Sequence, residues 1–187
     1  MKKSIQPQAI LFPNPVLVVC TYDANGKPNA ATLAWGGIAS SQPPAISIAV
    51  QPRRYTYEAI MKRKAFTVNL VPEKYAAEAD YFGIASGRES DKFAVTGLTP
   101  AGSEVVDAPY IAEFPYALEC EIAHILDLGL HTLFIGEVKG TVVEDGAAAQ
   151  WSDIISWDAS TREYFAKGAP IAKAFSAGMR FTDKQFQ

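Results

Sequence analysis

The sequence predicts a mainly β protein: an antiparallel barrel decorated by short inserted helices. Apolar, β-branched runs follow one another in hairpin succession, with short helical segments between them. The regular strand–helix alternation of a doubly wound parallel sheet is missing. No repeat or linker divides the 187 residues, so we expect a single domain, 1–187.

Six runs carry the strand pattern, and two of them are joined by a clear turn signal. The expected strands are residues 15–22, 28–35, 45–50, 65–71, 116–126 and 131–143. Asn25-Gly26 predicts a hairpin turn between the first two. Gly36-Gly37 and residues 40–44 are expected to break the pattern, and residues 96–109 to be irregular.

Short helices are expected over residues 57–64 and 73–82, with a third after the polar loop that begins at Ser86. Thr56 and Ser90 are the candidate N-caps of the first and third helices. Near the C-terminal end, residues 147–151 read as helix and residues 154–157 as strand.

Composition limits the possible partners. Hydrophobic residues make up 49% and charged residues 20%, a globular balance, and the net charge of −3 argues against nucleic acid or an anionic membrane as the main partner. No apolar run approaches a membrane span, and no secretory signal pattern is found, so we expect a cytoplasmic protein. Cys20 and Cys120 lie in apolar runs and are expected to be buried thiols, and no metal site is predicted.

Two predicted helix starts favour the binding of an anion. Arg53, Arg54 and Thr56 lie between a strand and a helix start, where free N–H groups and guanidinium donors suit a phosphate. Lys92 lies just past a second helix start, after a loop of hydroxyl and glycine residues. The alternative for each place is an ordinary solvated helix start.

Residues 29–38 (NAATLAWGGI) are small and apolar except for Asn29, Thr32 and Trp35. Small side chains allow a planar ligand to approach the backbone, and a tryptophan can flank it. The alternative is a plain edge strand with Trp35 in the core. Catalysis by a serine triad is disfavoured, because no nucleophile elbow is present and His124 shares a predicted core face with Leu118 and Ile122.

Several blocks together resemble a known family. The runs NAATLAWGGIASSQPPAISIAVQPRRYTYEAI, FTVNL, SGRESDKF and HTLFIGEV, in this order, resemble the flavin reductase-like FMN-binding split barrels, with the flavoredoxin branch most similar. The tail REYFAKGAPIAKAFSAG fits that branch too, so the resemblance spans roughly residues 15–178. It implies a Greek-key split barrel that forms a homodimer, with FMN near the interface.

The resemblance also implies roles for particular residues. Thr32, Leu33, Ala34 and Trp35 would contact the flavin ring, with Asn29 nearby. Arg53, Thr56 and Lys92 would meet the phosphate, and whether Arg53 or Arg54 does so stays open. His131 would lie beside the flavin, and Tyr164 would cover part of the pocket; otherwise His131 is a strand-end histidine in solvent.

The function implied is electron transfer from NADH or NADPH through bound FMN to a flavin, ferric or protein acceptor. No side chain is assigned a catalytic role, because the flavin itself carries the chemistry. One alternative is an FMN module that carries electrons without turning over nicotinamide. Another is a relative of pyridoxamine phosphate oxidase, which uses a similar barrel.

Overall fold

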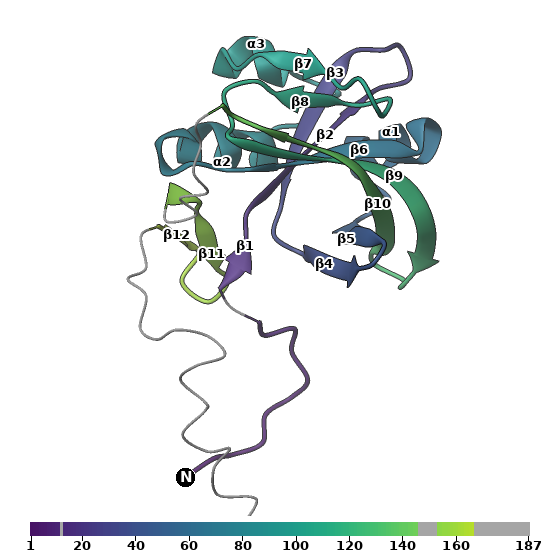
Figure 1. The fold of residues 1–187 in the computed structure, drawn as a ribbon. Helices are drawn as coiled ribbons and strands as arrows, with labels where there is room; N and C mark the ends of the chain where they lie inside the picture. The colour runs from purple at the N-terminus through teal and green to yellow at the C-terminus, as the bar shows by residue number, and fades with distance from the viewer. Residues whose placement is uncertain (12, 146–152, 167–187) are drawn as a thin grey trace, which may run out of the picture.

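The computed structural model describes residues 1–11, 13–145 and 153–166, and a curled seven-stranded antiparallel sheet forms its centre (Figure 1). The strand order is β3-β2-β6-β9-β10-β5-β4. These strands are β2 (Leu17–Tyr22), β3 (Pro28–Leu33), β4 (Gly36–Ser41), β5 (Pro44–Val50), β6 (Ala65–Leu70), β9 (Tyr116–Asp127) and β10 (Thr132–Val143). The edge strands β3 and β4 are consecutive in the chain, so the sheet curls back on itself as the expected barrel. Ala49 N donates to Trp35 O at 2.8 Å, which extends the β4–β5 pairing by one residue toward β3.

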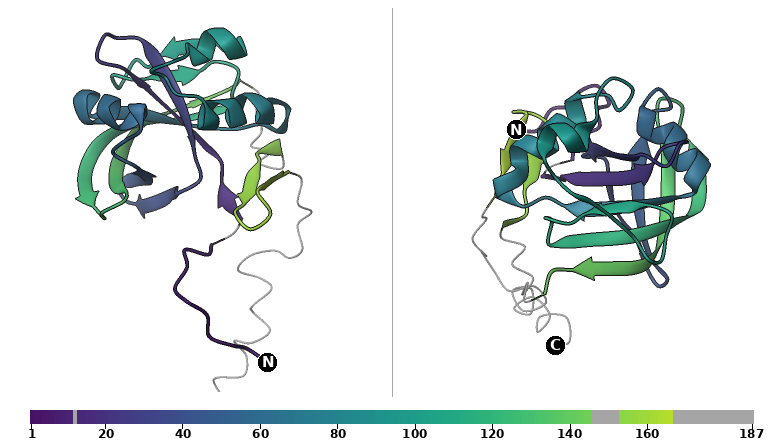
Figure 2. Two further views of the ribbon diagram at one scale, coloured as in Figure 1. Left: turned by 180° about the vertical axis from the view of Figure 1, so that it is seen from behind. Right: turned by 90° about the horizontal axis from the view of Figure 1, so that it is seen from above.

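In the part of the chain that the structure describes, three α-helices lie on the side of the barrel away from β4 and β5 (Figures 1 and 2). They are α1 (Tyr55–Arg63), α2 (Ala76–Ile84), which a 3₁₀ turn η1 (Glu73–Tyr75) precedes, and α3 (Lys92–Thr96). The small sheets are β7 (Pro100–Gly102) with β8 (Pro109–Ile111), and β1 (Asn14–Pro15) with β11 (Ser156–Asp158) and β12 (Glu163–Phe165). Among the described residues, no helix is both long and apolar enough to cross a membrane.

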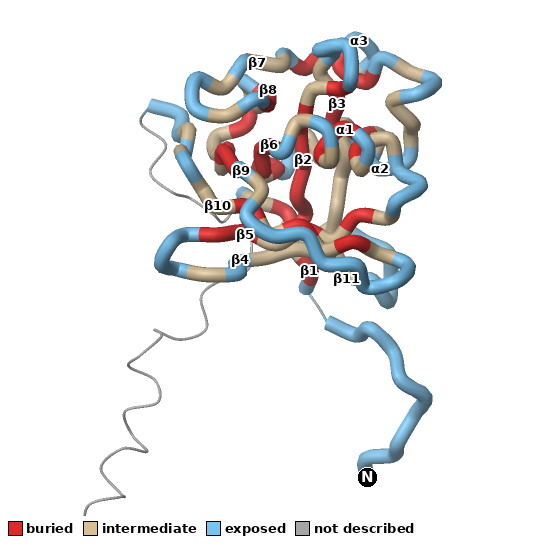
Figure 3. Tube along the Cα trace, turned by 90° about the vertical axis from the view of Figure 1, so that its right-hand side faces the viewer, coloured by how far each residue is buried: buried red, intermediate tan, exposed pale blue. Residues whose placement is uncertain are grey.

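The alternation of β2 explains why the protein has two apolar cores. Leu17 and Val19 point into the barrel, where they join a cluster that includes Phe66 and Phe134. Val18 and Cys20 point to the opposite face, toward the helices. The strand is therefore buried on both faces, as the red segment in Figure 3 shows. Both cysteines are buried and free, as expected.

The break expected at Gly36-Gly37 is wrong, because Gly36–Ser41 forms β4 and pairs with β5. The break expected at residues 40–44 is confined to a turn at residues 42–43, between β4 and β5. The glycine that suggested a break permits close pairing instead: a Cβ on Gly36 would lie 2.6 Å from Ser47 O. Residues 96–109 are also less irregular than expected, since they contribute β7 and the first residue of β8.

Both predicted N-caps are wrong. Helix α1 starts two residues early, at Tyr55, with Arg54 as N-cap, so Thr56 lies in its first turn. Asp91 caps α3 by accepting from Ala94 N at 3.1 Å, whereas the Ser90 hydroxyl bonds to Tyr81 Oη at 2.9 Å. A carboxylate is the stronger acceptor at a helix start, which explains the outcome at α3.

His124 is exposed, which overturns its assignment to a core face. A register shift in the β9–β10 ladder pairs His124 with Ile135 but Ile122 with Gly136, so the alternation reverses at Ala123. Such a bulge turns the following side chains to the other face. The helix expected at residues 147–151 lies outside the described part of the chain.

Candidate ligand-binding site

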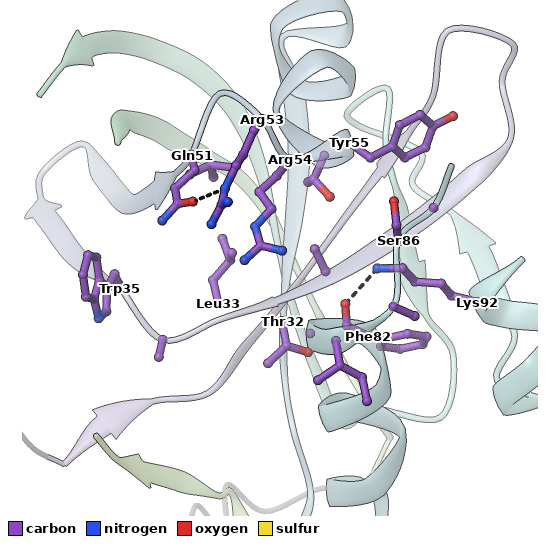
Figure 4. A pocket seen from close by; sticks show the side chains of 18 of the residues that line it. Thr32, Leu33, Trp35, Gln51, Arg53, Arg54, Tyr55, Phe82, Ser86 and Lys92 are labelled. Carbon is purple, nitrogen blue, oxygen red and sulfur yellow. Dashed lines mark hydrogen bonds between the residues drawn. The ribbon is translucent and has the colours of Figure 1, made fainter. Parts of the chain in front are cut away.

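A cavity of about 490 Å³ lies between β3, the start of α1, the end of α2 and the start of β10 (Figure 4). Its volume falls within the usual range for small-molecule and cofactor pockets. Every charged side chain found to line it is cationic: Arg53, Arg54, Arg88 and Lys92. Trp35 lies at one end and Lys92 and Ser86 at the other, with both arginines 53 and 54 between them (Figure 4).

The N-terminus of α1 supplies donors to what we call the anion end, formed by Arg54, Thr56, Ser86 and Lys92. Among the described residues no side chain caps this helix, and Tyr57 N bonds to Arg54 O, so the N–H groups of Tyr55 and Thr56 remain to bind a ligand. Thr56 Oγ1 accepts a hydrogen bond of 3.0 Å from Asn29 Nδ2, which leaves the hydroxyl proton of Thr56 to donate. The Arg54 guanidinium points into the cavity (Figure 4).

Lys92 is buried, with a residue exposure of 5%, although it carries a charge. Its Nζ donates to Ala30 O and to Phe82 O, both at 2.8 Å, and one of the three ammonium protons remains for the cavity. Burial, and then the charge of Arg54, lower the pKa of Lys92 to about 8. A bound anion would offset both effects.

Gly87 shapes the wall of the anion end. A Cβ there would collide with Asn29 Oδ1 and with the ring of Tyr55, so only glycine fits. Arg88 fastens the same loop to α1: its Nη2 lies 2.6 Å from Glu58 Oε1, and its guanidinium lies over the Tyr55 ring. The loop and the helix start are therefore held together before any ligand arrives.

The opposite end, which we call the ring end, is formed by Leu33, Ala34, Trp35, Gln51 and His131. The Trp35 and His131 rings lie 4.6 Å apart between centroids, at an interplanar angle of 44°. Trp35 is 46% exposed, so it is not the core residue of the alternative interpretation. This end offers apolar and aromatic surface to a planar group.

A second cavity of about 310 Å³ adjoins the first and shares five lining residues with it: Thr32, Leu33, Ala34, Gly83 and Trp157. Tyr164 and Trp157 line it from β12 and β11. Tyr164 Oη donates to Asp80 Oδ1 at 2.9 Å, and burial together with that carboxylate raises the pKa of Tyr164 to about 12. The tyrosine is thus a neutral donor fixed toward α2.

The structure brings most of the predicted site residues to one cavity. Those that line it are Thr32, Leu33, Ala34, Trp35, Arg53, Arg54, Thr56, Lys92 and His131. Asn29 lies behind Thr56, and Tyr164 belongs to the adjoining cavity. The Thr32 hydroxyl donates to Ala79 O of α2, so it is used within the fold.

Sequence reasoning missed Gln51, Tyr55 and Trp157 as lining residues. Gln51 directly follows a predicted strand and precedes the arginines, which was a usable signal. Trp157 had no such signal, because its place depends on the pairing of β11 with β1. Among the described residues, no cluster suited to a metal ion is found.

Known proteins share the sequence pattern and the fold of this chain. The model of the flavin reductase like domain matches residues 9–165. The structure of flavoredoxin from Desulfovibrio vulgaris (Miyazaki F) is 42% identical and superposes with a TM-score of 0.87, over 95% of this chain and 100% of that one. Flavoredoxin from Methanosarcina acetivorans superposes with a TM-score of 0.89 at 24% identity, over 97% and 99% of the two chains.

Two curated relatives are less similar to this chain and longer than it. An uncharacterized protein of Aeropyrum pernix is 33% identical over 147 residues, which are 78% of this chain and 56% of that protein. A high molecular weight rubredoxin of Moorella thermoacetica is 33% identical over 106 residues, 56% of this chain and 45% of its own length. The chain thus spans about half the length of these two relatives.

Proposed function

The chain belongs to the flavin reductase like domain family, and we propose that it binds FMN and serves as a redox protein of the flavin reductase or flavoredoxin type. One observation carries the proposal: a single cavity joins a cationic end to an aromatic end. FMN has the matching shape, with a phosphate at one end and a planar ring at the other.

The residues fit FMN in chemistry as well as in shape. Arg54, Thr56 and Lys92 would bind the phosphate, with the uncapped start of α1 beside them. Residues 32–35 and His131 would hold the ring, and Asn29 would orient the Thr56 hydroxyl. No glycine-rich nucleotide loop is required, because the donors come from separate elements.

When bound, FMN supplies hydride and electron transfer, and the protein supplies binding, orientation and local electrostatics. The proposed electron donor is NADH or NADPH, and the proposed acceptor is a flavin, a ferric chelate or a protein. We assign no side chain as a general acid or base. The proposal also includes a single domain and a cytoplasmic location.

The proposal includes a homodimer with FMN near its interface. Large apolar side chains are exposed beside the ring end: Trp35, Ile38 (83% exposed), Leu128 and Leu130. β4, which carries Ile38, is an edge strand of the sheet. Covering this surface with a second copy would remove apolar area from water. Light scattering of the full chain tests it, and a monomer at micromolar concentration would remove the dimer from the proposal.

An electron-carrier module is the second candidate. It is favoured by the 42% identity to a flavoredoxin and by the match to a rubredoxin-named protein. The same residues would bind FMN, but nicotinamide would not be turned over. A relative of pyridoxamine phosphate oxidase is the third candidate, and oxygen-dependent formation of pyridoxal phosphate would favour it.

The experiment has two stages. Purified protein should be yellow, or become so on addition of FMN, and denaturation should release FMN; protein that stays colourless and does not bind micromolar FMN would refute the proposal. Anaerobic mixing with NADH or NADPH then separates the first two candidates. Prompt bleaching of the flavin absorbance supports a reductase, and no bleaching with either donor supports the carrier.

A further inference from the structure

We propose that Arg53 and Gln51 set the tautomer of His131, so that this ring offers the cavity a hydrogen-bond donor at Nδ1. Gln51 and Arg53 would be positioning residues that act through His131. The use of that donor for a flavin rests on the proposed function. The tautomer itself rests on the contacts of this chain alone.

The sheet register brings Gln51 and His131 together. Val50, at the end of β5, pairs with Thr132, at the start of β10. In an antiparallel pair, the next residue on one strand faces the preceding residue on the other, so Gln51 lies opposite His131. Gln51 Nε2 and His131 Nε2 are 3.3 Å apart.

Arg53 decides which way the Gln51 amide faces. Arg53 Nε donates to Gln51 Oε1 at 2.7 Å, and this bond is drawn in Figure 4. A guanidinium has donors and no acceptor, so it can meet only the carbonyl oxygen of the amide. The amide NH₂ group is therefore turned toward His131.

The proton on His131 follows from that orientation. An NH₂ group needs an acceptor, and the imidazole nitrogen that faces it, Nε2, accepts only with a free lone pair. A neutral imidazole carries one proton, which must then lie on Nδ1. Both hydrogen bonds therefore run from donor to acceptor in the same direction: Arg53 donates to Gln51, and Gln51 donates to His131.

This arrangement gives the ring end a hydrogen-bond donor at a defined atom, His131 Nδ1. Trp35 packs against the His131 ring, and no partner for Nδ1 is found among the residues that the structure describes. The Nδ1–H group is therefore free for a ligand that presents an acceptor, such as a carbonyl oxygen at the edge of a planar ring. A solvated histidine favours the opposite tautomer, with the proton on Nε2.

Nitrogen NMR of the full chain labelled with ¹⁵N-histidine tests the tautomer directly. The chain contains two histidines, and the exposed His124 serves as an internal reference for the solvated tautomer. At a pH of about 8.5, where an ordinary imidazole is neutral, we expect the proton of His131 on Nδ1 and that of His124 on Nε2. A His124→Gln variant assigns the signals.

Substitution of Gln51 should reverse the result. In Gln51→Glu the carboxylate can only accept, so His131 should move its proton to Nε2. Gln6→Glu, an exposed residue, controls for the added charge and should change nothing. The spectra are recorded as purified and after saturation with FMN, and Gln51→Glu should bind FMN and riboflavin about fivefold more weakly, as expected for one lost hydrogen bond.

Two results would overturn the inference: a wild-type His131 protonated on Nε2, or a Gln51→Glu variant that keeps the proton on Nδ1. Neither result depends on whether FMN binds. Conversely, a protein that refuses FMN but shows the expected tautomers would refute the proposed function and leave the hydrogen-bond chain intact.

Discussion

The two ends of the cavity are built differently. At the anion end, Lys92 and Thr56 are buried, and both are held by hydrogen bonds to neighbouring elements. At the ring end, Trp35 and Ile38 are exposed, and the aromatic pair of Trp35 and His131 opens toward an edge strand. One end is thus complete within a single chain, whereas the other leaves apolar surface uncovered.

The difference indicates that the two ends contribute differently to flavin binding. Fixed donors bind an anion without ordering cost, so the anion end should supply most of the affinity. The apolar surface left at the ring end is the surface that the second copy covers in the proposed homodimer. Riboflavin has the same ring as FMN without the phosphate, so a change at the anion end should affect FMN alone. A change at the ring end should affect both flavins equally.

The largest effect is expected from Lys92→Ala. The loss of a charge-assisted bond should weaken FMN binding by roughly 10- to 100-fold and leave riboflavin binding much less changed. The variant should also unfold more easily, because Ala30 O and Phe82 O lose their donor inside the protein. Flavin titration and urea unfolding measure the two effects.

Lys62→Ala is the matched control for Lys92→Ala. Lys62 is an exposed lysine that donates to Ala24 O and does not line the cavity. It should change neither FMN affinity nor the urea midpoint appreciably. Equal weakening of FMN and riboflavin in folded Lys92→Ala would contradict the assignment of Lys92 to the phosphate.

Arg54→Ala and Arg53→Ala form the next pair and sharpen the comparison, because Arg54 belongs to the anion end whereas Arg53 contacts Gln51 of the ring end. Arg54 lies close enough to Lys92 to lower its pKa, whereas Arg53 bonds to Gln51 near His131. Arg54→Ala should weaken FMN by about tenfold with little change for riboflavin. Arg53→Ala should weaken both flavins by a similar, smaller factor. The reverse pattern would place Arg53 at the phosphate.

The pH dependence of FMN affinity tests the role of Lys92 at the anion end without a mutation. With its pKa lowered to about 8, Lys92 loses its proton above that pH, and phosphate binding must then take the proton up again. FMN affinity should therefore fall as pH rises, by about fivefold between pH 8 and 9. Riboflavin affinity should stay flat, and an equally flat FMN profile would show that Lys92 does not meet the phosphate.

The sequence predicted the barrel and most of the cavity, because both depend on local patterns. Alternating runs indicated the strands, and arginines before a helix indicated an anion site. What it missed depends on distant pairing: the bulge that exposes His124, and the register that sets Gln51 against His131. The N-cap predictions failed for local reasons: α1 has no side-chain cap at Arg54, and at α3 the carboxylate of Asp91 takes the position that was predicted for the adjacent Ser90.

Trp35→Ala should give the smallest change in affinity and tests the ring end. Trp35 is half exposed, so its loss should weaken FMN and riboflavin alike by about threefold, near the value of one aromatic contact. The fluorescence of bound flavin should rise, because an indole beside the ring quenches it, and Trp35→Phe should restore the affinity but only part of the quenching. Measurement of both flavins decides the assignment: if Trp35→Ala weakens FMN and spares riboflavin, Trp35 acts on the phosphate end and the division between the two ends fails.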